Sequence, residues 1–325
     1  MRRLFLVFLI LPLILVARGK VIYQQVHPNI EPPWLTGPLL APAAQVVPIG
    51  SCNIEPYYFG TAYTGVYNSD WDVDSLPTFW SNTLQIITQI GIAKWMDFQF
   101  SPTFFWNYTQ HQASWALGDL PIGLDIQLFS SPLGAKLPSV KLALREIIPI
   151  GKYRKLNPKK LLTDAGGEGS WMTSFGIVIG HAHHISSVYY FNYRVALSYN
   201  LPAPVHLKGL SLFGGGFDTD ARMFPAQNFL ADIGIEVTLA QTWAFALDIL
   251  GEWDGKQHFT GKQGTLANGA PASLSEGSAA QFSLAPAIEY NWSAQLGVIA
   301  GAWFTVAGRN ATDFINGVFA ANYYF

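Results

Sequence analysis

Long segments in which apolar and polar residues alternate place the strongest constraint on the fold of this chain. In the segment "MDFQFSPTFFWNYT", residues 96–109, the apolar side chains of Met96, Phe98 and Phe104 share one parity. Polar side chains, among them Asp97, occupy the other parity. A period of two residues places these sets on opposite faces of a β-strand, whereas a helix would scatter them around its circumference. The pattern therefore predicts a strand with one apolar and one polar face.

Twelve segments of this kind follow one another along the chain. A strand in a soluble protein averages about 5–6 residues, whereas a tilted membrane strand needs about 9–11, and several of these segments are longer than ten residues. Connections after the odd-numbered segments are mostly long and those after the even-numbered ones mostly short, as in barrels with outer loops and periplasmic turns. The predicted strands are residues 53–67, 83–94, 96–109, 119–130, 138–152, 172–182, 188–202, 228–240, 243–254, 280–292, 294–307 and 314–325.

These observations predict an all-β fold, a transmembrane up-and-down antiparallel β-barrel of about 12 strands over residues 53–325. In lipid only helices and closed barrels satisfy every backbone N–H and C=O group. A soluble β-sandwich or solenoid is the alternative, and it explains the alternation but not the strand lengths or the asymmetry of the connections. Charged residues make up 12 % of the chain, about half the share in soluble domains, which also favours the barrel.

The N-terminal residues have the features of a secretory signal peptide, predicted to cover residues 1–19. Arg2 and Arg3 precede an apolar run from Leu4 to Ala17, which is shorter than the roughly 20 apolar residues of a membrane-spanning helix. An exported barrel belongs in the outer membrane of a Gram-negative bacterium, and this is the predicted localisation. Cys52 is the only cysteine, so no intramolecular disulfide can form.

Two segments outside the predicted strands are rich in proline or glycine. Residues 20–52 are Pro-rich and have no period, so we expect an extended periplasmic N-terminal arm, with a plug folded back into the barrel as the alternative. The Gly-rich stretch 210–225 is expected in an outer loop that either folds inward over the mouth or stays exposed.

Charged residues within the predicted strands fall almost entirely on the polar parity and are predicted to line the interior. Two interpretations remain open: the charges face an aqueous pore and select solutes, or they pair across a packed interior, because unpaired buried charge is costly. Acidic residues outnumber basic ones, which favours cations or neutral solutes. The predicted pore-lining residues are Glu55, Asp97, Asp125, Lys141, Arg145, Arg194, Asp232, Glu236, Asp248, Glu252 and Glu289.

The last predicted strand, "FINGVFAANYYF", carries apolar or small residues on one parity. It must pair with the first strand to remove the open edge of the sheet. Its aromatic end, Tyr323 and Phe325, is similar to the signal by which barrel-assembly machinery recognises its clients. Tryptophans near the strand ends are expected to form girdles at the membrane interfaces. The expected partners are therefore outer-membrane lipid, the assembly machinery and a small-molecule solute.

No motif for catalysis, metal binding or cofactor binding is evident. The run "HAHH", 181–184, is expected at a turn on the periplasmic rim, since carboxylate or cysteine partners for a metal are missing. The run "GGG", 214–216, lacks the Lys and Ser/Thr of a phosphate loop, and no Gly-x-Ser-x-Gly motif is present. A net charge of −2 gives no reason to expect nucleic-acid binding. We therefore predict no catalytic residues, no cofactor and no enzyme activity.

Two stretches of the chain resemble an outer-membrane transporter family named for the meta-pathway of phenol degradation. They are "GDLPIGLDIQLF", 118–129, and "PSVKLALREIIPIGKY", 138–153, with matching positions Gly118, Asp119, Leu120, Gly123, Pro149 and Gly151. Residues 285–310 and the final "NYYF" are also similar to the late strands of this family. The resemblance implies a barrel and the uptake of small aromatic or hydrophobic molecules. The predicted function is a passive porin-like channel, and the alternative is a non-conducting structural or adhesive barrel with interaction loops.

Overall fold

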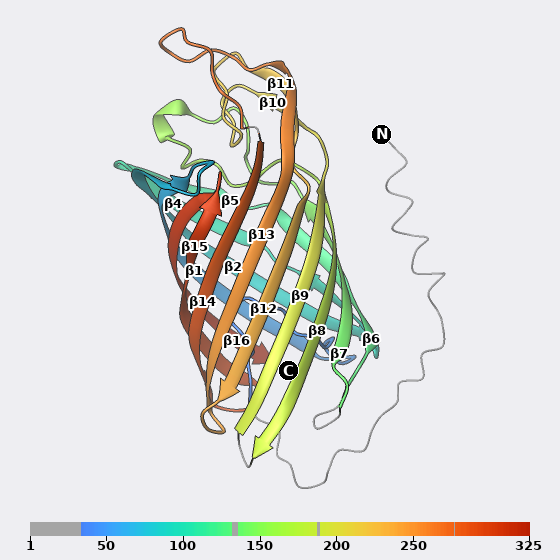
Figure 1. Ribbon diagram of the computed structural model, residues 1–325. Coiled ribbons are helices and arrows are strands. Elements are labelled where there is room, and N and C mark those ends of the chain that lie inside the picture. The colour runs from blue at the N-terminus through green and yellow to red at the C-terminus, as the bar shows by residue number, and fades with distance from the viewer. Residues whose placement is uncertain (1–33, 132–135, 187–188, 276) are drawn as a thin grey trace.

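The computed structural model describes residues 34–131, 136–186, 189–275 and 277–325 (Figure 1). The predicted signal peptide, residues 1–19, lies outside the described residues. In the described chain no helix is long and apolar enough to span a membrane. The elements are β1 Cys52–Tyr67, β2 Val73–Ala93, β3 Met96–Phe100, β4 Thr103–Thr109, β5 Gln112–Leu117, β6 Leu120–Phe129, β7 Ser139–Ile148, the 3-10 helix η1 Pro158–Lys160, β8 Met172–Ser186, β9 Tyr189–Pro202, β10 Val205–Lys208, β11 Asp220–Phe224, β12 Asn228–Thr238, β13 Trp243–Lys262, β14 Gly277–Asn291, β15 Leu296–Arg309 and β16 Thr312–Tyr324.

The strands form a closed antiparallel barrel with twelve wall positions. β3 with β4 and β5 with β6 each share one position, while β10 and β11 lie above the wall. β1 closes the barrel because it pairs on both sides: Tyr57 lies opposite Gln85 of β2 and Ala320 of β16. The predicted pairing of the last strand with the first is confirmed, and with it the predicted fold class.

A proline interrupts one of the predicted wall strands. Residues 96–109, predicted as one strand, form β3 and β4 because Pro102 has no N–H to donate to the ladder. The ladder continues around the break, since Ile86 N donates to Pro102 O at 3.0 Å and Ser101 N donates to Pro121 O at 3.0 Å. The wall therefore stays sealed at this point by backbone hydrogen bonds.

The two ends of the barrel carry different connections. Residues 94–95, 239–242 and 292–295 join strands at one end, and the long segments 149–171 and 203–227 lie at the other (Figure 1). In outer-membrane barrels the short turns face the periplasm and the long loops face outward. The C-terminal end of β16 therefore lies on the periplasmic side.

A small three-stranded sheet stands above the wall on the outer side. The upper part of β13 continues past the barrel and pairs with β11, which pairs with β10 (Figure 1). One face of this sheet packs into a hydrophobic cluster that includes Leu207, Met223 and Leu274. We call this sheet the headpiece. The stretch 210–225, expected to be a loop, contains β11, which pairs with residues 258–262 of β13.

Large apolar side chains cover the outer surface of the wall. All nine tryptophans expected near strand ends are exposed: Trp71, Trp80, Trp95, Trp106, Trp115, Trp171, Trp243, Trp253 and Trp292. Trp95 and Trp292 lie in the periplasmic turns, and Trp253 lies toward the outer end of the wall. Aromatic side chains at both ends of an apolar band are the arrangement of membrane-spanning barrels.

Candidate functional site

The described part of the N-terminal segment, residues 34–50, lies inside the barrel and is called the arm below. The expectation of an extended periplasmic arm over residues 20–52 is wrong for this part, and the alternative of a plug describes it. The physical reason is that inward-facing side chains of the wall bind the arm through its main chain. Both ends of the arm are at the periplasmic side: Asn291, the last residue of β14, donates to Trp34 O at 3.0 Å, and the arm leads into β1 at Cys52.

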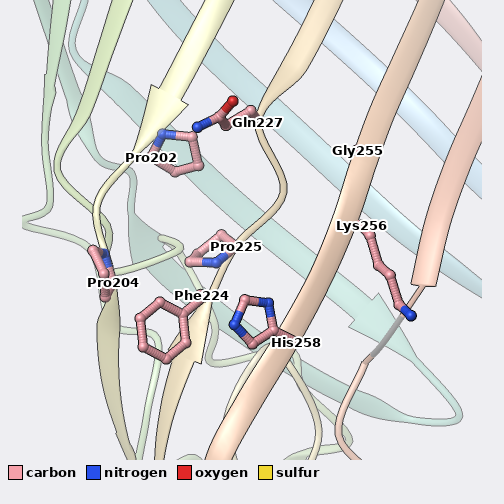
Figure 2. Close-up of a pocket in the computed structure, with 8 residues that line it drawn as sticks. All are labelled: Pro202, Pro204, Phe224, Pro225, Gln227, Gly255, Lys256 and His258. Carbon is pink, nitrogen blue, oxygen red and sulfur yellow. The ribbon is translucent and has the colours of Figure 1, made fainter.

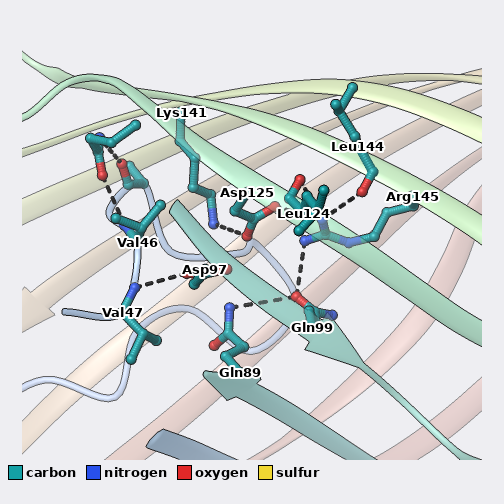
Figure 3. Close-up of polar contacts among 12 residues, drawn as sticks. Val46, Val47, Gln89, Asp97, Gln99, Leu124, Asp125, Lys141, Leu144 and Arg145 are labelled. Carbon is teal, nitrogen blue, oxygen red and sulfur yellow. Dashed lines mark hydrogen bonds and ion pairs between the residues drawn. The ribbon is translucent and has the colours of Figure 1, made fainter. Parts of the chain in front are cut away.

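Carboxylates of the wall accept hydrogen bonds from the arm's backbone amides. Asp248 of β13 accepts from Leu40 N at 3.2 Å and from Ala41 N at 3.0 Å. On another part of the wall, Asp97 of β3 accepts from Val47 N at 2.8 Å (Figure 3). Hydrogen bonds to an ionised acceptor are stronger than neutral ones, so these contacts anchor the arm at separate points.

Other wall side chains donate to the arm's carbonyl groups. Arg194 of β9 donates from Nη1 to Ala41 O at 3.1 Å. Gln127 of β6 donates from Nε2 to Ala44 O at 3.0 Å and accepts from Val46 N at 2.8 Å. The arm thus satisfies its polar backbone groups against the wall, as buried backbone groups require.

Glycines on the inner wall make room for the arm. A Cβ at Gly234 of β12 would lie 2.7 Å from Ala41 Cβ, and a Cβ at Gly180 of β8 would lie 2.6 Å from Ala44 Cβ. A side chain at Gly91 of β2 would collide with the arm's backbone at residue 48. These three strands are spread around the barrel, so the interior is shaped to the path of the arm.

The arm also packs apolar side chains against the wall, with Leu39 the most deeply buried large one. Leu39 is fully buried and packs in a cluster with inward-facing small residues such as Ala246 and Ala285 and with Ile299. Alanines on this side leave a recess that Leu39 fills. Burying a leucine side chain stabilises by about 1.5–3 kcal/mol, which adds to the hydrogen bonds in holding the arm.

A buried ion-pair network lies beside the arm on β3, β6 and β7 (Figure 3). Asp125 binds Lys141 Nζ at 2.7 Å and Arg145 Nη1 at 2.5 Å, and both Asp125 and Lys141 are fully buried. Arg145 also donates to Gln99 Oε1 at 2.9 Å. Gly123, opposite Arg145 in the ladder, leaves the space that the guanidinium stem occupies. On this side the charges pair, as the packed interpretation predicts.

On the opposite, acidic side of the interior, the buried carboxyl groups have fewer hydrogen-bond partners. Glu236 accepts from Asn192 Nδ2 at 2.9 Å, and Glu289 accepts from Asn291 Nδ2 at 2.6 Å and from Thr36 N of the arm. One oxygen of Asp232 is buried without a hydrogen-bond partner in the described residues, and the buried carboxyls of Glu236 and Glu289 hydrogen-bond to each other. Two carboxyl groups can hydrogen-bond only when they share a proton, and an unsatisfied buried oxygen is costly, so this half of the interior is held less firmly than the ion-paired half.

The predicted pore-lining residues divide by burial. Glu55, Arg145, Arg194 and Glu252 are partly exposed; Glu55 accepts from Asn322 at 2.7 Å and Glu252 from Asn228 at 2.5 Å. The other seven are 3 % exposed or less, so they do not line an open passage in this state: Asp97, Asp125, Lys141, Asp232, Glu236, Asp248 and Glu289. Sequence analysis found these wall residues but missed their contacts with the arm. The glycines on the inward-facing parity of the strands are the sequence feature that could have indicated a segment packed inside the barrel.

The residues that carry the family resemblance contact one another. Asp119 accepts from Gly151 N at 2.8 Å through one oxygen and from Glu168 N at 2.8 Å through the other. A Cβ at Gly118 would lie 2.9 Å from Thr103 Cβ. The motif therefore fixes the loop 149–171 onto the wall at the outer end of the barrel.

The histidine run and the chain end lie at the periplasmic side. Residues 181–184 belong to β8 and not to a turn, and the rings of His181 and His183 are 4.2 Å apart. In the part of the chain that the structure describes, no group of three or more His, Cys, Asp or Glu residues is arranged to hold a metal ion. Phe325 exchanges two backbone hydrogen bonds with Cys52, at 2.7 and 2.9 Å, and its ring lies 5.4 Å from that of Tyr323.

Comparison with known proteins gives matches in structure alone. No family model and no curated protein matches the chain. An outer membrane channel from Pseudomonas putida F1 has a similar structure, with a TM-score of 0.65 and 12 % identity over 87 % of this chain and 98 % of that one. The NanC porin matches with a TM-score of 0.42 and 8 % identity over 82 % and 98 % of the two chains. The similarity to the Pseudomonas channel supports the barrel fold.

Closure of the sheet and the apolar outer band determine where the protein resides. A closed antiparallel barrel satisfies its backbone groups within lipid, and the aromatic girdles mark the two membrane interfaces. In bacteria this architecture belongs to the outer membrane. The chain is therefore a transmembrane β-barrel of the bacterial outer membrane.

Proposed function

We propose that the barrel is a passive channel for small solutes and that the arm closes its periplasmic half. The arm carries the proposal: it crosses the interior, is held at separate points, and has both ends on the periplasmic side. It can leave the barrel without being threaded through it. Twelve strands lie between the eight whose interior side chains fill and the sixteen that leave a water-filled channel, so removing the arm would leave room for small solutes.

The class of solute is a proposal based on resemblance. The transporter family that the motifs resemble is associated with small aromatic or hydrophobic molecules. The excess of acidic residues on the inner wall favours cations or neutral molecules over anions. A neutral aromatic compound satisfies both considerations, and liposome swelling with neutral, cationic, anionic and aromatic solutes would rank them.

The test is planar-bilayer conductance of the refolded barrel and of the variant Gly234→Leu. A side chain at this position would occupy the space of Ala41, so the arm cannot seat. The matched control is Gly317→Leu, because a Cβ at Gly317 has no other atom within 4 Å. We expect low conductance for the unmodified protein and the control, and a higher conductance for Gly234→Leu.

The outcomes separate the two parts of the proposal. If Gly234→Leu stays closed while a variant lacking residues 20–50 conducts, the arm does not seat as described. If neither variant conducts at any voltage, the channel proposal fails and a non-conducting structural or adhesive barrel remains. In an open variant, changing Asp232, Glu236 and Asp248 together to Asn should lower cation preference, measured as a shift in reversal potential. An unchanged reversal potential would remove these residues from the conduction path.

A further inference from the structure

The headpiece sheet has one buried and one exposed face. Along β10 and β11, Val205, Leu207, Ala221 and Met223 are buried in its hydrophobic cluster. The residues between them alternate outward and are exposed. The buried face also contacts Phe213, a residue of the outer loops, so the exposed face points away from those loops.

The exposed face carries mostly positive charge. Its cations are Lys208, Arg222 and Lys262, and Lys256 lies just below them on β13. Asp220, which lies between Lys208 and Lys262 in the ladder, pairs with His206 at 2.7 Å, and Lys262 pairs with Asp218. Asp218 and Asp220 lie at the end of β11 farthest from the barrel wall, and no ion pair of Arg222 or Lys256 is present among the described residues. The whole chain has a net charge of −2, which makes this basic face a local feature.

A pocket opens at the junction between this face and the barrel wall. Figure 2 shows it between the end of β9, the segment before β12 and β13; its volume is about 370 Å³. Phe224 and His258 form one side with their rings stacked 4.7 Å apart, and the guanidinium of Arg222 lies 5.1 Å over the ring of Phe224. The lining residues are Pro202, Pro204, Phe224, Pro225, Gln227, Gly255, Lys256 and His258.

The pocket is continuous with the lipid-facing surface. Gln227, which lines the pocket, accepts a hydrogen bond from Tyr199 Oη at 2.6 Å. Tyr199 lies opposite Phe229 in the ladder, and the ring of Phe229 faces outward beside that of Trp253. Lys256 follows Trp253 by three residues, about 10 Å along a strand. Because interfacial aromatics mark the edge of the hydrocarbon layer, the pocket and Lys256 lie at the height of lipid head groups in the outer leaflet.

We propose that this pocket and the basic face bind a phosphate group of lipid A in the lipopolysaccharide of the outer leaflet. Arg222 and Lys256 would contact the phosphate oxygens, because guanidinium and ammonium groups are the common phosphate ligands. The acyl chains of the lipid would follow the aromatic strip of Tyr199, Phe229 and Trp253 down the wall. The occupant follows from charge complementarity and from the continuity of the pocket with the membrane-facing band.

The test compares binding of diphosphorylated lipid A with binding of the same lipid A lacking its phosphates. The full barrel, refolded in detergent, is titrated with each lipid and measured by native mass spectrometry. The test variant is the double substitution Arg222→Gln and Lys256→Gln. The matched control is Lys159→Gln and Lys160→Gln, which removes two charges from η1 in another outer loop. Heat-modifiable migration on a gel confirms that each variant is folded.

We expect the unmodified protein to bind the phosphorylated lipid about tenfold or more tightly than the phosphate-free lipid, given the attraction of basic residues to anionic lipid. The test variant should lose this preference and the control should keep it. Equal binding of the two lipids would overturn the proposal, as would an equal loss in the control. Displacement of the lipid by millimolar inorganic phosphate would also overturn it, because the site would then recognise free phosphate.

Discussion

Replacement of Asp248 by alanine tests whether the arm is held as one cooperative unit. Asp248 is fully buried and accepts from two arm amides, those of Leu40 and Ala41. A hydrogen bond to a charged group contributes about 1.5 kcal/mol or more, so losing two costs about 3 kcal/mol. At about 1.4 kcal/mol per factor of ten, the fraction of molecules with the arm released should rise about 100-fold.

The assay is hydrogen exchange at the other end of the arm. The amides of Val46 and Val47 are bound by Gln127 and Asp97, not by Asp248. Their exchange therefore reports release of the whole arm and not the local loss of two bonds. In lipid nanodiscs we expect their protection to fall about 100-fold in Asp248→Ala.

The control is Glu252→Ala, which removes the same charge from the same strand. Its described hydrogen-bond partner is Asn228 and not the arm. Exchange at Val46 and Val47 should be unchanged in this variant. Unchanged exchange in Asp248→Ala would refute cooperative seating, and an equal increase in both variants would show a general effect of charge.

Other predictions concern stability, fit and assembly. Asp125→Ala leaves two cations without their buried partner and should lower the free energy of unfolding by about 3–5 kcal/mol, whereas Lys262→Ala in an exposed pair should cost less than about 1 kcal/mol; urea unfolding followed by tryptophan fluorescence compares them. Gly37→Ala should loosen the arm and raise conductance, because φ +112° strains any side chain and the Arg194 guanidinium would have to move away from Ala41 O; a conductance equal to that of the unmodified protein would contradict this fit. Deleting Phe325 should impair outer-membrane insertion while export to the periplasm continues, as fractionation would show, and normal insertion would remove its proposed role as a signal.

The sequence by itself determined the wall of the barrel. Alternation placed the strand 188–202 where the structure has Tyr189–Pro202, and 228–240 where it has Asn228–Thr238. The physical reason is that lipid outside and polar groups inside impose a period of two on every wall strand. The prediction failed where that constraint is absent: residues 73–82 were expected in a loop, but they extend β2 beyond the alternating stretch.

Only the tertiary structure decided what fills the interior. The wall binds the arm through its backbone amides and carbonyls. Such main-chain contacts do not require particular side chains, so the arm's sequence shows no periodic pattern of apolar and polar residues. Gly91, Gly180 and Gly234 show the same limit: each makes room for a segment far away in the chain, which no local pattern reveals. The alternation identified Asp97 and Asp248 as inward-facing, but whether they face water, a cation or a peptide amide depended on where residues 34–50 lie.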